Sequence, residues 1–330
     1  MSFKTVLWLI GVGWAGIAIY LVTALGLLFS QWPGEVVSSS GLHFNRLDKE
    51  DNASDIPLTR YETRNGSHLN IRYYKSSKGS APLVILIHGS GWHGGSYLGL
   101  AKALSDEADV IVPDLRGHGV APKRRGDVDY LGQYEDDIAD LIKRYRKKGQ
   151  KLILTGHSSG GGLVIRYAGG KYGKELDGAI LIAPYLQYNA PTLRPNSGGW
   201  AFPITRRIIG LSMLNAIGIS QFNNFTVVQF KFPSDVLNGK EGRTATQAYS
   251  YRLIQSYSPR RDYLKDIASL PAFLLIAGKE DEAFLADKYK PTMSAVSSRG
   301  EYLVLDGFSH LDVFSSAPAK QAMIKFIQSM

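Results

Sequence analysis

Residues 156–160, with the sequence Gly-His-Ser-Ser-Gly, have the types and spacing of a nucleophilic serine set in a tight turn. An apolar run that predicts a buried strand precedes them, and a segment that predicts a helix follows. In a G-x-S-x-G turn of this kind, the serine hydroxyl stands exposed above the sheet. The flanking glycines are needed because a Cβ at either place would crowd the turn. We predict Ser158 as the nucleophile; Ser159 is the weaker candidate, since His157 and not glycine stands two residues before it.

A serine hydroxyl attacks effectively only when a base takes its proton and an acid orients that base. Two predicted strands downstream, 273–277 and 301–305, each end in a loop that carries such a group. Asp281 in the first loop is the predicted acid, and His310 in the second is the predicted base. The other candidates for the acid are Glu280 and, more distantly, Asp306.

Cleavage through a tetrahedral intermediate also needs two backbone N–H groups directed at the oxyanion. The residue after the nucleophile supplies one, here Ser159. The other is expected in the loop after an earlier strand, and residues 82–87 form such a strand before His-Gly-Ser-Gly at 88–91. We predict the amide of Ser90 as the second donor, with Gly91 as the alternative.

The residues around these motifs alternate between apolar strands and helical stretches. This pattern predicts an α/β fold with a mostly parallel sheet that is covered on both faces. Residues 61–74 alternate between apolar and polar side chains, which favours antiparallel edge strands. The strands are expected at 83–87, 110–113, 152–154 and 178–183, and the helices at 98–108, 130–147 and 159–172.

From roughly Arg60 to Met330 the chain resembles the α/β-hydrolase superfamily, and within it the monoacylglycerol lipase and lysophospholipase branch of serine aminopeptidase-like hydrolases. The matching stretches are HGSG at 88–91, DLRGHG at 114–119, GHSSGG at 156–161, GKED at 278–281 and GFSH at 307–310. The resemblance implies a serine esterase or lipase that uses Ser158, Asp281 and His310, with the amides of Ser90 and Ser159 as the oxyanion hole. The lipase branch usually has Met at position 159 and Ser at position 121, where this chain has Ser and Ala. These departures leave the triad intact and bear on the substrate.

Four polar residues near the motifs are predicted to brace loops rather than to react. They are His88, Arg116, His118 and His157, and all lie beside glycine turns. Between 185 and 242 the alternation of strands and helices breaks, and apolar residues accumulate. The resemblance places a cap over the nucleophile here, and a long apolar insertion at the carboxyl end of a sheet is expected to cover the acyl pocket. Its aromatic residues are Trp200, Phe202, Phe222, Phe225, Phe230 and Phe232.

Residues 6–29 are apolar and carry no charge. As a helix they would span about 36 Å, enough for a hydrocarbon core of about 30 Å. Trp8 lies near one end of the segment and Trp32 just past the other, as interfacial anchors would. We predict a short head at 1–5, a retained transmembrane anchor at 6–29, a linker at 30–57 that lifts the domain off the membrane, and a catalytic domain at 58–330.

A cleaved signal peptide is the alternative for this segment. It is disfavoured because the apolar stretch exceeds the usual 7–15 residues and no A-x-A site ends it. Lys4 is the only charged side chain before the segment, and Arg46 and Lys49 follow at a distance, so the charge bias sets the orientation weakly. Export of the domain, with only the five-residue head left inside, is the simpler arrangement.

Composition excludes several classes of function. The 330 residues include no cysteine, which rules out disulfides, thiolate catalysis and Cys-ligated metals. Neither a metal-ligand spacing nor a phosphate-binding G-x-x-x-x-G-K-[ST] motif occurs, so no metal or other cofactor is expected. The net charge of +9 comes without a nucleic-acid recognition motif. Attraction to anionic lipid headgroups fits this charge better.

The sequence therefore favours a membrane-anchored serine hydrolase that cleaves carboxylic esters of lipid-like substrates, such as monoacylglycerols or lysophospholipids. An aminopeptidase or amidase of the same fold remains an alternative, although no carboxylate in the cap is evidently committed to a substrate amine. A catalytically silent, membrane-bound interaction protein is the second alternative. Epoxide hydrolases and dehalogenases are disfavoured because they need a carboxylate at position 158.

Overall fold

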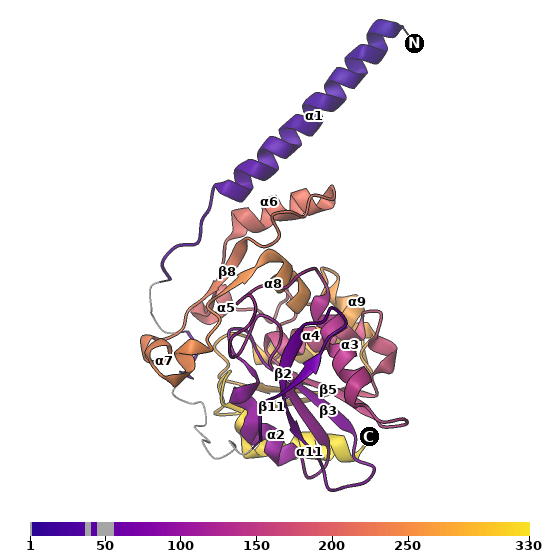
Figure 1. The fold of residues 1–330 in the computed structure, drawn as a ribbon, viewed down its shortest axis with the longest axis vertical. Helices are drawn as coiled ribbons and strands as arrows, with labels where there is room; N and C mark the ends of the chain where they lie inside the picture. The colour runs from indigo at the N-terminus through magenta and orange to yellow at the C-terminus, as the bar shows by residue number, and fades with distance from the viewer. Residues whose placement is uncertain (1, 37–40, 45–55) are drawn as a thin grey trace.

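The structure is a computed structural model that describes residues 2–36, 41–44 and 56–330. An eight-stranded sheet with the order β1-β2-β4-β3-β5-β6-β10-β11 forms its centre (Figure 1). The strands from β4 to β11 in this order run parallel, whereas β1 and β2 are antiparallel, as predicted for the edge. The strands are β1 (Thr59–Glu62), β2 (His68–Tyr74), β3 (Leu83–Ile87), β4 (Asp109–Pro113), β5 (Leu152–His157), β6 (Gly178–Ile182), β10 (Ala272–Gly278) and β11 (Gly300–Leu305). The predicted fold class is confirmed.

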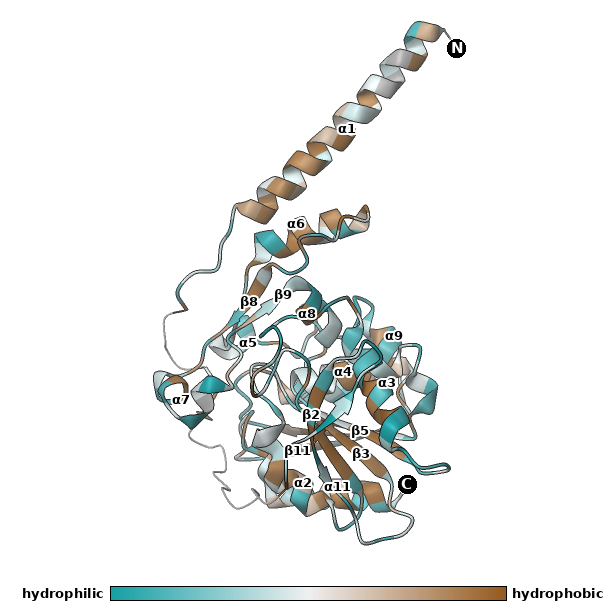
Figure 2. Ribbon diagram, in the orientation of Figure 1, coloured by the Kyte–Doolittle hydropathy of each residue, from teal (hydrophilic) through white to brown (hydrophobic). Residues whose placement is uncertain are grey.

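Helices cover both faces of this sheet, which explains why its central strands are apolar throughout. In β3, for example, all five residues are buried. Val84 and Leu86 belong to the core on one face, and Leu83, Ile85 and Ile87 belong to the core on the other. Figure 2 shows the strands as hydrophobic ribbons between the two layers. One layer is α2 (Leu98–Leu104) and α11 (Ala317–Gln328); the other is α3 (Gln133–Tyr145), α4 (Ser159–Ala168), α8 (Tyr251–Tyr257), α9 (Tyr263–Ala268) and α10 (Tyr289–Ser294).

Three helices are shorter than the sequence pattern predicted. Helix α3 begins at Gln133 because Gly132 before it has a left-handed φ of 88°. Helix α4 ends at Ala168, where Gly169 and Gly170 follow, and α2 ends at Leu104 in a polar turn. The periodic residues that suggested longer helices lie in these turns.

A cap follows β6 and covers the carboxyl edge of the sheet (Figure 1). It contains a separate antiparallel sheet in the order β7-β8-β9. Because β9 pairs with β8, the cap continues past the expected end near residue 242. Its elements are α5 (Asn196–Gly199), β7 (Ala201–Pro203), α6 (Thr205–Ala216), β8 (Thr226–Phe230), α7 (Ser234–Asn238) and β9 (Ala248–Ser250).

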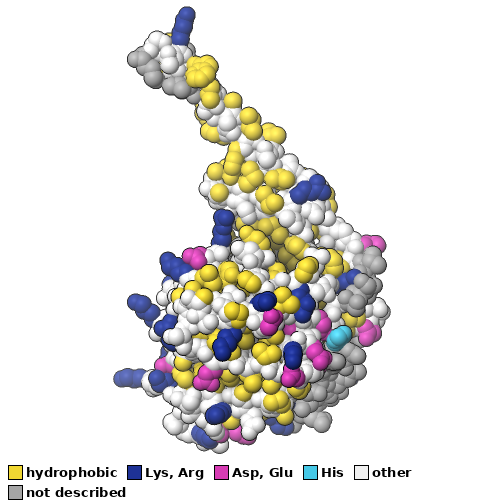
Figure 3. Space-filling model, turned by 180° about the vertical axis from the view of Figure 1, so that it is seen from behind, with side chains coloured by type: hydrophobic (Ala, Val, Ile, Leu, Met, Phe, Trp, Pro, Cys, Tyr) yellow, Lys and Arg dark blue, Asp and Glu magenta, His cyan; other side chains and the backbone are white. Residues whose placement is uncertain are grey.

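Helix α1 (Phe3–Phe29) projects from the domain, and among the described residues its last turns lie against α6 (Figure 1). The two helices approach closely at Gly210, where a Cβ would lie 2.5 Å from the carbonyl oxygen of Ala24. The hydroxyl of Tyr20 donates to the carbonyl of Met213 at 2.8 Å. Trp14 and other apolar side chains in the N-terminal part of α1 are exposed. Figure 3 shows hydrophobic side chains along the helix down to the place where it meets the domain.

The segment Gly41–Phe44, between α1 and the sheet, packs onto the domain rather than standing off it. Leu42 and Phe44 are buried. The ring of Phe44 lies 5.5 Å from Trp92, 5.5 Å from Trp200 and 5.8 Å from Phe232, between ring centroids. Other parts of the expected linker, residues 37–40 and 45–55, lie outside the described residues.

Candidate active site

Ser158 lies in a strained turn between β5 and α4. Its φ of 56° and ψ of −121° fall in a region that residues other than glycine rarely occupy. The turn is held by the Ser158 N–H, which donates to the carbonyl of Ile182 at 2.9 Å. A Cβ at Gly156 would lie 2.3 Å from the carbonyl oxygen of Gly160. The steric role predicted for the two glycines is thus confirmed.

Gly160 gives a direct test of this packing. A Cβ there would lie 2.5 Å from the carbonyl oxygens of both Ile87 and His88, and backbone atoms in a central strand cannot move aside. We expect Gly160→Ala to lower the free energy of unfolding by about 1–3 kcal/mol. The measurement is the thermal unfolding midpoint, with Gly79→Ala as the control because a Cβ at Gly79 meets nothing within 4 Å. Equal stability of the two variants would contradict the prediction.

The structure brings three sequence-predicted side chains together at the carboxyl edge of the sheet. The Oγ of Ser158 lies 3.0 Å from Nε2 of His310. The Nδ1 of His310 lies 2.8 Å from Oδ2 of Asp281. With Nδ1 as the donor to Asp281, Nε2 is left as an acceptor for the Ser158 hydroxyl. The three side chains therefore form a continuous hydrogen-bonded chain from a carboxylate to a hydroxyl.

Asp281 differs from the two other acid candidates in its surroundings. It is buried, and its Oδ1 accepts hydrogen bonds from the N–H groups of Ala283 and Phe284, both at 2.8 Å. These bonds fix the carboxylate so that Oδ2 faces His310. Glu280 is exposed, and Asp306 is exposed and pairs with Lys279 at 2.8 Å. Only Asp281 among the three contacts the imidazole.

The charges beside His310 favour its protonated form. Burial alone lowers the pKa of His310, but the charge of Asp281 and the hydrogen bond to it raise that pKa, and the charge of Glu282 adds to the effect. The resulting pKa lies above the ordinary value. Glu282 also accepts a hydrogen bond from the His310 N–H at 2.9 Å and binds His43 through its other oxygen, at 2.7 Å from Nδ1. No pattern in the sequence indicated this bridge, because His43 is distant along the chain.

The predicted oxyanion donors are Ser159, next to Ser158 in the chain, and Ser90, in a loop that approaches Ser158 at Gly89, where a Cβ would lie 3.3 Å from the Ser158 Cβ. Ser159 is the first residue of α4, where an N–H has no partner within the helix. In the other loop, Gly89 N–H donates to Tyr97 Oη at 3.1 Å and Gly91 N–H donates to Tyr249 Oη at 2.6 Å. Within the described part of the chain, the N–H of Ser90 donates to no protein acceptor. The N–H of Gly91, the alternative donor, is therefore occupied, which leaves Ser90 as the candidate donor of the two.

The predicted bracing histidines are buried in the layer beneath the site. His157 bridges Tyr97 Oη at 2.8 Å and the carbonyl of His310 at 2.9 Å. Burial and the nearby His310 lower the pKa of His157 well below its ordinary value. His88 accepts the N–H of Leu115 at 3.1 Å, and burial lowers the pKa of His88 to about 4. Both rings are thus neutral supports for the loops that carry the site.

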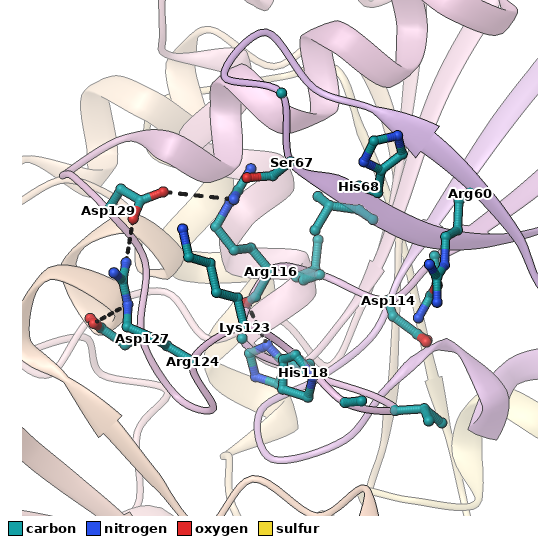
Figure 4. A pocket seen from close by; sticks show the side chains of 18 residues that line it. Arg60, Ser67, His68, Asp114, Arg116, His118, Lys123, Arg124, Asp127 and Asp129 are labelled. Atoms are coloured by element: carbon teal, nitrogen blue, oxygen red, sulfur yellow. Dashed lines mark hydrogen bonds and ion pairs between the residues drawn. The ribbon is translucent and has the colours of Figure 1, made fainter.

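A polar cavity of about 400 Å³ is lined in part by the loop that follows β4 (Figure 4). Arg116 and His118 line it, together with Asp129, which pairs with Arg116 at 3.7 Å. None of Ser158, Asp281 and His310 borders this cavity. In the described residues, no group of three or more His, Asp or Glu side chains is arranged to hold a metal ion.

Comparison with known families now identifies the chain. Residues 79–314 match the family described as serine aminopeptidase, S33. The chain belongs to the serine aminopeptidase S33 family. The matched range contains the strained turn at Ser158 (the nucleophile elbow), the predicted acid and base, and the cap, so the resemblance stated from short motifs is confirmed over most of the domain.

Curated proteins related to this S33 chain include human monoglyceride lipase, 26% identical over 176 residues, which are 52% of the chain and 56% of the lipase. The 2-(acetamidomethylene)succinate hydrolase of Mesorhizobium japonicum is 31% identical over 157 residues, 46% of the chain and 55% of that enzyme. The chain spans between 26% and 56% of the length of these two relatives and three further curated ones.

The fold is shared with solved structures over a longer range. A bacterial membrane phospholipase A aligns with 100% of the chain and 100% of its own length, with a TM-score of 0.56 and 16% identity. The monoacylglycerol lipase of Paleococcus ferrophilus covers 79% of the chain and 98% of its own length, with a TM-score of 0.58 and 19% identity. At these identities the likeness concerns the α/β-hydrolase fold.

Proposed function

We propose that this protein is a membrane-anchored serine hydrolase that cleaves carboxylic esters of lipid-like substrates. The observation that supports this most directly is the hydrogen-bonded chain of Ser158, His310 and Asp281, at 3.0 Å and 2.8 Å, with the serine on a strained turn. A buried carboxylate, an imidazole and a serine hydroxyl at the carboxyl edge of the sheet, in this order, are the parts that nucleophilic acyl transfer requires. A catalytically silent protein would have no need of this strained arrangement.

In the proposed mechanism, Ser158 Oγ attacks the ester carbonyl while His310 Nε2 takes its proton. The N–H groups of Ser90 and Ser159 stabilise the oxyanion of the tetrahedral intermediate. His310 then donates the proton to the departing alcohol, which leaves an acyl group on Ser158. A water molecule, activated by the same imidazole, hydrolyses the acyl-enzyme, and Asp281 holds the ring and stabilises its charged form throughout.

The mechanism predicts a specific dependence on pH. His310 must be neutral to act as the base, and its pKa lies above the ordinary value of about 6.5. Activity should therefore be lost as pH falls and should rise with a single inflection above about 6.5. The measurement is kcat/KM against pH with a soluble ester. An inflection below 6, or a flat profile from pH 5 to 8, would contradict the assignment of His310.

Several observations support a lipid-like ester as substrate. Human monoglyceride lipase is a relative by sequence, and monoacylglycerol lipase and membrane phospholipase A share the fold. A buried aromatic cluster of the cap lies beside the loop at 88–91, which carries Ser90 and is called the oxyanion loop here. The cluster consists of Trp200, Phe230 and Phe232. The Trp200 Nε1–H donates to Ser90 Oγ at 3.1 Å, so this apolar wall stands directly at the site. Apolar walls with few polar groups suit acyl chains.

The proposal is tested with p-nitrophenyl esters of increasing acyl length, run beside a monoacylglycerol, a lysophospholipid and aminoacyl anilides. Covalent labelling by a fluorophosphonate probe reports whether Ser158 is reactive. We expect labelling, and hydrolysis of esters that favours acyl chains over acetate. Faster cleavage of the anilides would instead support the amidase alternative. A folded protein that neither labels nor hydrolyses any of these compounds would refute a serine hydrolase.

The membrane anchor is proposed for α1. Among the described helices it is the one long and apolar enough to cross a bilayer. Its C-terminal turns also carry contacts that a mature domain would lose on cleavage: Arg207 Nε donates to the carbonyl of Leu28 at 3.3 Å, and the Arg207 guanidinium lies 4.7 Å from the ring centroid of Trp32. These contacts favour a retained helix over a removed signal peptide.

Membrane attachment is tested by fractionation of cells that express the full chain. A retained anchor keeps the protein in the membrane pellet after alkaline carbonate washing and releases it only with detergent. N-terminal sequencing of the purified protein then distinguishes the two arrangements, because a cleaved signal peptide would leave a mature chain that starts after the apolar helix. Protease protection in intact cells tests the proposed extracytoplasmic position of the domain.

A further inference from the structure

Gly91, the residue after the proposed oxyanion donor, is held by the cap at both of its backbone polar groups. Its N–H donates to Tyr249 Oη at 2.6 Å, and its carbonyl accepts the N–H of Thr246 at 2.8 Å. Tyr249 lies in β9 and Thr246 just before it, and both are fully buried. Hydrogen bonds from the cap therefore hold the loop that carries Ser90.

The conformation of Gly91 fits this clamp and leaves little freedom. Its φ is 79°, a left-handed value that suits glycine. A Cβ at this position would lie 2.7 Å from the ring of Phe232. The peptide unit that bears the Gly91 N–H is bonded directly to the Cα of Ser90. Fixing that unit restricts the rotation of Ser90 and so determines where the Ser90 N–H points.

A second tyrosine holds the other side of the loop. Tyr97, from the body of the domain, accepts the N–H of Gly89 at 3.1 Å. The amides of Gly89 and Gly91 are thus both bound by tyrosine hydroxyls, and the amide between them, that of Ser90, is left for the substrate. One tyrosine belongs to the body and the other to the cap, so both layers position this single donor.

His118 fixes the direction of the Tyr249 hydroxyl. Since that oxygen accepts from Gly91, its proton is given to another group, and Nε2 of His118 lies 2.6 Å away. The opposite nitrogen, Nδ1, lies 3.0 Å from the carbonyl of Arg116 and donates to it, which leaves Nε2 as an acceptor. Burial lowers the pKa of His118 well below its ordinary value, so the ring stays neutral and keeps this role. Figure 4 shows Arg116 and His118 at the wall of the polar cavity.

We propose that Tyr249 is a positioning residue for the oxyanion hole, oriented by His118, and that the cap thereby contributes to the chemical step as well as to substrate binding. This inference rests on the proposed esterase function. It follows that the cap cannot move away from the body as a rigid lid without releasing Gly91 and loosening the Ser90 donor.

The test is Tyr249→Phe, which removes one oxygen and keeps the buried ring. Loss of a whole oxyanion donor costs a factor of 100 to 1,000 in rate, so a loosened donor is expected to cost roughly 10- to 100-fold in kcat. KM for a short soluble ester such as p-nitrophenyl butyrate should change by less than about twofold, and the low-pH inflection set by His310 should stay in place. Tyr167→Phe is the control, because Tyr167 is equally buried and its hydroxyl has no hydrogen-bond partner among the described residues, so that it contacts neither Gly91 nor His118.

His118→Leu is the second variant, since it removes the acceptor for the Tyr249 proton from the other side. It should lower kcat in the same way, and the double variant should be no worse than Tyr249→Phe alone because both act on one donor. Unfolding midpoints of all variants are compared by circular dichroism. A kcat for Tyr249→Phe equal to that of Tyr167→Phe, or a loss confined to KM, would overturn the inference. An inactive wild-type protein would instead refute the proposed function.

Discussion

Ser158→Ala is expected to lower kcat by roughly a million-fold, because removal of the nucleophile abolishes the acyl-enzyme route while binding and the oxyanion hole persist. The same change should abolish labelling by the fluorophosphonate probe, since no other hydroxyl lies against His310 Nε2 in the described structure. Both quantities are measured on purified protein, with the most rapidly cleaved p-nitrophenyl ester as substrate. Residual turnover, if any, should show no burst of product.

Ser77→Ala is the control, because Ser77 is an exposed loop serine distant from the elbow in sequence. It should label and turn over as the wild type does. The stability of Ser158→Ala should be equal to or above that of the wild type, since alanine occupies the strained turn with fewer hydrogen-bonding demands. If Ser158→Ala kept more than about 1% of the wild-type rate, another residue would be the nucleophile.

Asp281→Asn should lower kcat by about 10,000-fold. An amide that donates toward His310 forces the other tautomer, in which Nε2 carries a proton and cannot accept the one from Ser158. The change also removes the negative charge of Asp281, which raises the pKa of His310, and leaves the burial that lowers this pKa. The low-pH limb of the remaining activity should therefore move to lower pH than in the wild type.

The measurements are kcat and the full pH profile of kcat/KM. Glu280→Gln and Asp306→Asn serve as controls, because both carboxylates are exposed and neither contacts the imidazole. These variants should retain the wild-type rate and inflection. Equal losses in Asp281→Asn and Asp306→Asn would show that net charge near the site, rather than the bond to His310, is what matters.

The parts of the molecule that the sequence predicted well are those encoded locally. Strand β3 is recognisable because five consecutive buried residues must be apolar when helices cover both faces. The elbow is recognisable because only small residues fit beside Ser158, as the contacts of Gly156 and Gly160 show. The loops after β10 and β11 follow from the parallel arrangement, which places the carboxyl ends of strands at one edge.

The parts that it did not predict depend on contacts between distant segments. Tyr249 and Gly91 are 158 positions apart, and an aromatic residue in a short cap strand carries no sign of a hydrogen-bond partner. The same is true of Glu282, which joins His43 to His310. Strand β9 was missed because it is only three residues long and pairs with β8 across a bulge.

The docking of Gly41–Phe44 has a practical consequence for anyone who prepares this protein without its apolar helix. Phe44 fills an aromatic socket formed by Trp92, Trp200 and Phe232. Two of these rings, Trp200 and Phe232, also lie against Gly91. A shortened protein that starts at residue 58 would leave that socket open to solvent, next to the oxyanion loop. Such trimming would disturb the proposed catalytic centre, whereas a protein that starts at residue 41 keeps Phe44 among these aromatic rings.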